Sequence, residues 1–171
     1  MATDVLIADW IKRIADDERT RDAVRSREQQ TAARKAELIR VHGLRLLADL
    51  RAAAARDVEA FRGEFAGDPA RDITFDSESP EGGFIVRKPG TPAVTLALAP
   101  RLDAAAAGVN CHHRFMPAAG LPPREDRFDL MFSDDGDATL RMKHHGTGQV
   151  FGTVDALSEY LLVPVFTGRP R

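Results

Sequence analysis

Hydrophobic positions in the first 65 residues form two separate stripes, each with the three- and four-residue spacing of a helix face. The first stripe comprises Ile7, Trp10, Ile11 and Ile14. The second comprises Leu44, Leu47, Leu50, Ala54, Val58, Phe61 and Phe65. Between them, residues 16–37 are mostly polar. The heptad phase of Ile7, Ile11 and Ile14 continues onto Glu18, Arg21, Arg25 and Glu28, so it does not predict a continuous coiled-coil seam.

The same segment has the composition of a long helix. Residues 1–65 contain no proline and are rich in Ala, Arg, Leu and Glu, which are strong helix formers. Thr3 or Asp4 is the candidate N-cap, and Gly67 with Pro69 provides the stop. An unbroken helix would be roughly 90 Å long at 1.5 Å per residue. A hairpin broken near Gly43 is the alternative.

After residue 66 the pattern changes to short alternating segments separated by proline and glycine. These segments predict strands at Ile73–Phe75, Phe84–Val86, Val94–Leu98, Val109–Phe115, Phe128–Phe132, Ala138–His144 and Gln149–Phe151. Asp134–Asp137 has the composition of a tight hairpin. Thr153 predicts the cap of a closing helix over Val154–Leu162, with Pro164 just beyond its end.

The fold class that follows is α+β. We expect a helical arm over residues 1–66, as one helix or a hairpin broken near Gly43. A mostly antiparallel sheet module with a short C-terminal helix is expected over residues 67–171.

Composition narrows the class of protein. Of the 171 residues, 43% are apolar and 29% charged, which suits a packed domain better than general disorder, and the net charge of −2 gives no global basic field. No apolar run approaches the ~20 residues of a membrane span, and no secretory signal is visible at the N-terminus. A single cysteine excludes an internal disulfide. With an arginine-rich composition typical of GC-rich coding sequences, these features lead us to expect a bacterial cytoplasmic protein without membrane contact.

The most unusual chemical feature is the placement of histidine and cysteine. Cys111, His113 and His144 are residue types that zinc prefers. In a simple meander with a hairpin at 135–136, residue 131 faces about 139, residue 126 faces about 144, and Cys111 lies near 131. Cys111 and His144 would then be separated by about five residue levels, near 20 Å. We therefore expect no metal, no other cofactor and, because no catalytic motif is present, no enzymatic activity.

Basic residues are concentrated in the polar part of the arm. Residues 19–40 hold seven basic and three acidic side chains, a local excess of +4. An alternative function is therefore binding of nucleic acid or another anionic partner through Arg21, Arg25, Arg27, Arg34 and Lys35. A small-ligand or metal site near the paired histidines is a further alternative. The interspersed acids and the absence of stacking aromatics argue against nucleic acid.

The leading hypothesis is a non-enzymatic, self-associating interaction or scaffold module. Two separated apolar stripes on a long helix cannot both be buried on one small sheet unless the helix folds back or meets another chain. We expect a homo-oligomer, a dimer or higher, with Ile7, Trp10, Ile11 and Ile14 in the interface. A different protein is the alternative partner to a second copy of this chain.

Overall fold

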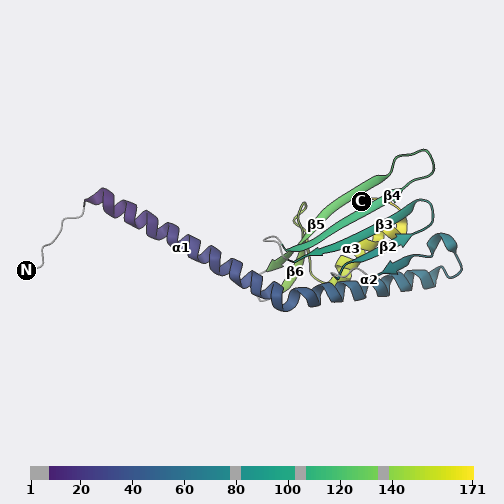
Figure 1. The fold of residues 1–171 in the computed structure, drawn as a ribbon, viewed down its shortest axis with the longest axis horizontal. Helices are drawn as coiled ribbons and strands as arrows, with labels where there is room; N and C mark the ends of the chain where they lie inside the picture. Colours follow the sequence, from purple (N-terminus) through teal and green to yellow (C-terminus); the bar gives the residue numbers. More distant parts are fainter. Residues whose placement is uncertain (1–7, 78–81, 103–106, 135–138) are drawn as a thin grey trace, which may run out of the picture. The chain divides into compact units, whose positions relative to one another are not determined.

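The computed structural model describes residues 8–77, 82–102, 107–134 and 139–171 (Figure 1). The chain divides into two compact units, Met1–Glu37 and Leu38–Arg171. The predicted α+β class is confirmed: a long N-terminal helical segment is followed by a seven-stranded antiparallel sheet and a short C-terminal helix. The prediction of a domain boundary near residue 66 stays a prediction. The helix that precedes that position belongs to the same compact unit as the sheet.

Helical backbone runs from residue 9 to residue 64 through three consecutive elements. These are α1 (Asp9–Leu38), a π-helical turn η1 (Ile39–Gly43) and α2 (Leu44–Glu64). Gly43 has helical angles, φ −62° and ψ −47°, so the hairpin alternative is wrong at this position. Gly43 is buried, and a Cβ there would lie 3.6 Å from the ring of Phe132. Gly43 therefore continues the helix and lies against the sheet instead of breaking the segment.

A short 3₁₀ helix, η2 (Pro69–Arg71), leads from α2 into the sheet. The strands are β1 (Thr74–Asp76), β2 (Phe84–Lys88), β3 (Ala93–Arg101), β4 (Gly108–Met116), β5 (Arg124–Asp134), β6 (Leu140–His144) and β7 (Val150–Phe151). They form one sheet in sequential order, an antiparallel meander from β1 to β7. Every predicted strand overlaps an observed one, although residues 135–138, which include the expected hairpin residues, lie outside the described part.

Helix α3 (Val154–Thr167) closes the fold and packs against α2 on one face of the sheet (Figure 1). The hydroxyl of Thr153 accepts a hydrogen bond from the amide of Ala156, which confirms the predicted cap. The predicted end before Pro164 is wrong. Pro164 lies inside the helix and is buried, and the helix ends where Gly168 adopts a left-handed φ of 68°.

The core lies between the two helices and the inner face of the sheet. Leu50 and Val58 of α2 meet Leu157 and Leu161 of α3 in the same hydrophobic cluster as alternate residues of the strands. β3 and β4 bury every second side chain, as expected for a sheet covered on one face. Helix α2 therefore contributes to the same core as the sheet.

Candidate functional site

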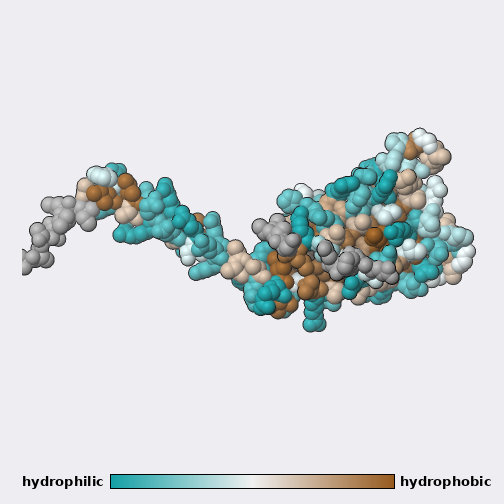
Figure 2. All heavy atoms as spheres, in the orientation of Figure 1, coloured by the Kyte–Doolittle hydropathy of each residue, from teal (hydrophilic) through white to brown (hydrophobic). Residues whose placement is uncertain are grey.

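Helix α1 exposes its hydrophobic residues. Trp10 is 59% exposed, Ile11 43%, Ile14 53% and Val24 48%, and α1 contains no buried residue. Ile7, the remaining residue of the predicted interface, lies outside the described residues. Figure 2 shows the hydrophobic side chains gathered at the start of α1, followed by a mostly hydrophilic stretch. Exposed aromatic and branched aliphatic side chains on one helix end are typical of a surface that a partner covers.

A shallow groove of about 470 Å³ lies further along the same helix. It is lined by Val24, Arg27, Glu28, Thr31, Ala32 and Lys35. Its lining combines the side chains of Val24, Thr31 and Ala32 with the aliphatic stems of Arg27 and Lys35. The first stripe and this groove are therefore two separate exposed features of one helix.

The basic residues of the arm are partly neutralised within α1. Arg21 lies 2.7 Å from the carboxylate of Glu18, and Arg25 lies 3.6 Å from that of Asp22. Arg27, Arg34 and Lys35 complete the predicted basic set, and Lys35 is half-buried in the groove wall. Exposed pairs at this spacing stabilise the helix by only ~0.2–0.5 kcal/mol each. They nevertheless reduce the positive field available to an anionic partner.

The sheet register places the candidate metal ligands differently from the sequence prediction. Met131 pairs with Lys143 and His144 with Leu130, whereas Cys111 pairs with Phe128. The predicted register is wrong because the last β5–β6 pair joins Asp134 to Leu140, so the connection is longer than a two-residue hairpin. Cys111 and His144 now differ by two residue levels across two strand spacings, or about 12 Å.

Phe128 occupies the space among the candidate ligands. Its ring centroid lies 5.9 Å from that of His113 and 4.9 Å from that of His144, and both pairs are stacked. Tyr160 of α3 adds an edge contact to both Phe128 and His144. Among the residues that the structure describes, no group of three His, Cys, Asp or Glu side chains is close enough to hold a metal ion. The structure therefore does not bring Cys111, His113 and His144 together.

Each histidine of this cluster makes a structural hydrogen bond. The Nε2 of His113 lies 2.8 Å from the carbonyl oxygen of Leu161, so this nitrogen must carry the proton. Its Nδ1 is buried without a partner in the described part of the chain. The Nδ1 of His144 accepts from the amides of Gly146 and Thr147, which fixes the turn after β6. Burial lowers the pKa of His113, because the charged imidazolium would lose its hydration.

Cys111 is a buried thiol rather than a nucleophile. Burial, with a smaller effect from the carboxylate of Asp129, raises the pKa of the Cys111 thiol far above its usual range. A thiol that stays protonated does not attack an electrophile at neutral pH. The thiolate–imidazole chemistry that Cys111 and His113 could provide is therefore suppressed by their surroundings.

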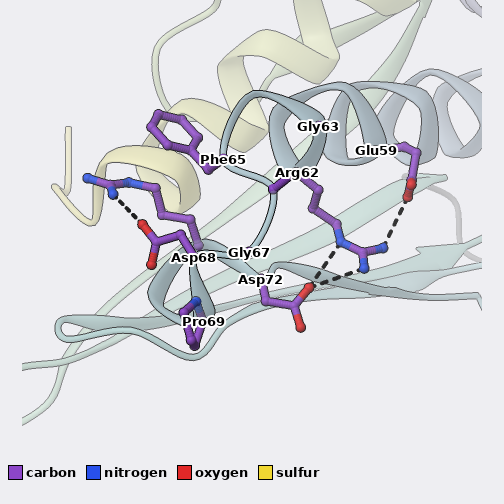
Figure 3. Close-up of a pocket in the computed structure, with 10 residues that line it drawn as sticks. Glu59, Arg62, Gly63, Phe65, Gly67, Asp68, Pro69 and Asp72 are labelled. Carbon is purple, nitrogen blue, oxygen red and sulfur yellow. Dashed lines mark hydrogen bonds and ion pairs between the residues drawn. The ribbon is translucent and has the colours of Figure 1, made fainter.

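A hollow of about 500 Å³ lies where α2 leads into η2 (Figure 3). Arg62 bridges Glu59 and Asp72, at 3.1 Å from each carboxylate. Arg71 pairs with Asp68 and stacks over the ring of Phe65, and this pairing holds the pKa of Asp68 below its usual value. Sequence reasoning missed this hollow, since its residues meet only through the turn after α2. Its charges are engaged with one another.

The uncovered face of the sheet carries a second charged cluster that sequence reasoning missed. Glu125 lies within 4 Å of side-chain nitrogens of three residues, His112, Arg114 and Arg127. The predicted strand began at Phe128, whereas β5 begins at Arg124 and pairs its charged residues with β4. Residues 124–127 are all charged, so the hydropathy pattern gave no signal for this extension.

The comparisons with known proteins gave no relative. No family model, no curated protein and no solved structure matches the chain. Within the described residues, no helix has both the length and the apolar character needed to cross a bilayer.

Proposed function

We propose that this protein is a non-enzymatic interaction module that associates with itself through α1. The observation that carries this proposal is that α1 has 30 residues, none of them buried, and exposes Trp10, Ile11 and Ile14. Helices in proteins take most of their stability from packing of an apolar face. Burial of each large apolar side chain is worth ~1.5–3 kcal/mol. A second chain supplies the surface that the stripe lacks.

The chemistry-bearing residues of the described structure support a non-enzymatic module. Cys111 is buried and protonated, His113 bonds a backbone carbonyl, and Arg62 is held by two carboxylates. We place the module in a bacterial cytoplasm, since its single thiol requires no oxidising compartment.

Sedimentation equilibrium of the full chain across micromolar concentrations tests the proposal. The wild-type chain is expected to be a dimer or larger. Replacing Trp10 and Ile14 with Asp is expected to shift it towards monomer, since the first stripe loses its apolar contacts. Ala23→Asp is the matched control, because this exposed residue lies on the opposite side of α1 and should leave association unchanged.

A wild-type chain that stays monomeric throughout would overturn the proposal. Binding of nucleic acid by the arm is the competing hypothesis and makes a different prediction. In that case the affinity for nucleic acid falls steeply as the salt concentration rises. A variant with Arg21, Arg25 and Arg34 replaced by Glu loses nucleic-acid binding. A gel-shift titration at two salt concentrations separates the two; we expect no binding at ~0.15 M salt, where exposed charges more than ~8 Å apart are screened.

A further inference from the structure

Seven positions on one face of α1 follow a heptad repeat. Their residue types indicate how a partner helix is oriented. Steps of four and three residues alternate from Trp10, and α1 is continuous over this stretch, so the positions share one face. They are Trp10, Ile14, Asp17, Arg21, Val24, Glu28 and Thr31. This phase starts from Trp10 instead of Ile11, and it includes Val24 and Thr31, which line the groove.

The charged residues of this face decide between the two ways of pairing identical helices. In a parallel, in-register pair, Asp17, Arg21 and Glu28 would each lie opposite themselves. Like charges held together in an interface cost several kcal/mol. In an antiparallel pair, a residue faces one from the other end of the face, and unlike charges can meet. Among the described residues, Asp17 has no ion-pair partner in its own chain.

We propose that α1 pairs antiparallel with α1 of a second copy, with the two-fold axis at the level of Arg19. Ile14 then lies opposite the partner's Val24, and Asp17 lies opposite the partner's Arg21. Trp10 reaches the groove beside the partner's Glu28, where the stem and guanidinium of the partner's Arg27 can cover the indole. By symmetry each contact occurs twice.

The register follows from satisfying these contacts together. Sliding the partner by one heptad towards its C-terminus places Asp17 opposite the partner's Glu28 and Ile14 opposite the partner's Thr31. That arrangement brings two acids together and loses the apolar match. The proposed register pairs Ile14 with Val24 and Asp17 with Arg21, and it seats Trp10 in the groove beside Glu28. It rests on the proposed function, because it assumes that α1 is the association helix.

Cross-linking of single-cysteine variants of the full chain tests the orientation. Ile14→Cys and Val24→Cys are prepared separately and treated with a short bis-maleimide, alone and mixed. The native Cys111 is buried and should not react in the folded chain. We expect covalent dimers mainly in the mixture, each containing one chain of each variant. Efficient cross-linking of Ile14→Cys with itself would show parallel pairing and overturn the inference.

Charge reversal tests the register independently. Asp17→Arg or Arg21→Asp alone places like charges opposite each other and is expected to weaken dimerisation about tenfold or more. The double variant restores opposite charges and is expected to dimerise like wild type. Asp16→Arg, an equal change of charge off the proposed face, serves as control. Circular dichroism checks that helix content is unchanged.

The outcomes separate this inference from the proposed function. Failure of the double variant to recover, or equal weakening by Asp16→Arg, overturns the register. A dimer that is disrupted at Trp10 and Ile14 but cross-links in parallel keeps the proposed function and removes this inference. A monomeric wild-type chain removes both.

Discussion

The Nε2 of His113 lies 2.8 Å from the carbonyl oxygen of Leu161, joining the centre of β4 to α3. Because the carbonyl can only accept, the ring is held as the neutral tautomer protonated at Nε2. The buried Nδ1, which would have to take the second proton, has no acceptor among the described residues. Protonation would leave this bond in place, but it would bury a charged imidazolium whose Nδ1 proton has no acceptor, so the folded state favours the neutral ring.

The first prediction concerns acid sensitivity. Burial lowers the pKa of His113 in the folded state, while in the unfolded chain it returns to about 6.5. The unfolded chain thus binds more protons, so stability is fully present above pH ~6.5 and falls as pH drops below it, by at most about 1.4 kcal/mol per pH unit for one proton. Urea unfolding between pH 5.5 and 7.5 measures this slope.

His113→Gln is expected to reduce the pH dependence of the free energy of unfolding, since the glutamine amide can donate to the carbonyl of Leu161 but does not titrate. His42→Gln, at an exposed position, is the matched control and should keep it. An unchanged slope in His113→Gln would assign the acid sensitivity to other groups.

The second prediction concerns the contact between α2 and α3. The buried hydroxyl of Ser158 donates a 2.7 Å hydrogen bond to the carboxylate of Asp57. Ser158→Ala should lower the free energy of unfolding by about 1–2 kcal/mol, as expected for loss of a hydrogen bond to a charged acceptor. Ser26→Ala, exposed on α1, should change it by less than ~0.5 kcal/mol. Equal effects of the two variants would contradict this role.

The third prediction tests a close approach of two strands. A Cβ at Gly108 would overlap the carbonyl oxygen of Leu130 and lie 3.0 Å from the Cα of Met131. Gly108→Ala should force β4 and β5 apart and destabilise the protein by ~3 kcal/mol or more. Gly63→Ala, in α2 with open space around it, should instead stabilise it by ~0.4–1 kcal/mol. Thermal unfolding of both variants measures the difference.

The fourth prediction concerns truncation. Residues 38–171 contain the whole described hydrophobic cluster, whereas residues 67–171 lack Leu47, Leu50, Ala54 and Val58 of α2. We expect a chain of residues 38–171 to unfold cooperatively and a chain of residues 67–171 to be unfolded. Loss of each buried leucine costs ~2–5 kcal/mol, a large part of the stability of a small domain. Cooperative unfolding of the shorter chain would contradict this.

The alternation within Phe84–Lys88, Ala93–Arg101 and Gly108–Met116 was sufficient to predict strands, since every second side chain there is buried against the core. Features that depend on tertiary contacts were harder to predict. Gly43 has the composition of a break because glycine weakens an isolated helix, yet its backbone is helical and it is buried against the sheet. Pro164 looked like a stop, but the buried face shared by Leu161 and Val165 continues the helix past the missing amide.

The candidate site likewise combines features that the sequence pattern predicted with features that depend on tertiary contacts. Exposure of the stripe at Trp10, Ile11 and Ile14 agrees with its polar surroundings in sequence. The separation of Cys111 from His144 was overestimated, because their relative level depends on the length of the β5–β6 connection. The stacking of His113 and His144 on Phe128 could not be read from spacing, since it arises diagonally across three strands.

Cys111 is buried between β3 and β5, so the reactivity of its thiol reports when the centre of the sheet opens. As the single thiol in the sequence, paired across from Leu98 and Phe128, it reacts with a thiol reagent only when the centre of the sheet separates. When reclosing is faster than reaction, the labelling rate is proportional to the population of the open state. The stability of the sheet can then be followed under native conditions, without denaturant and in the presence of a second copy.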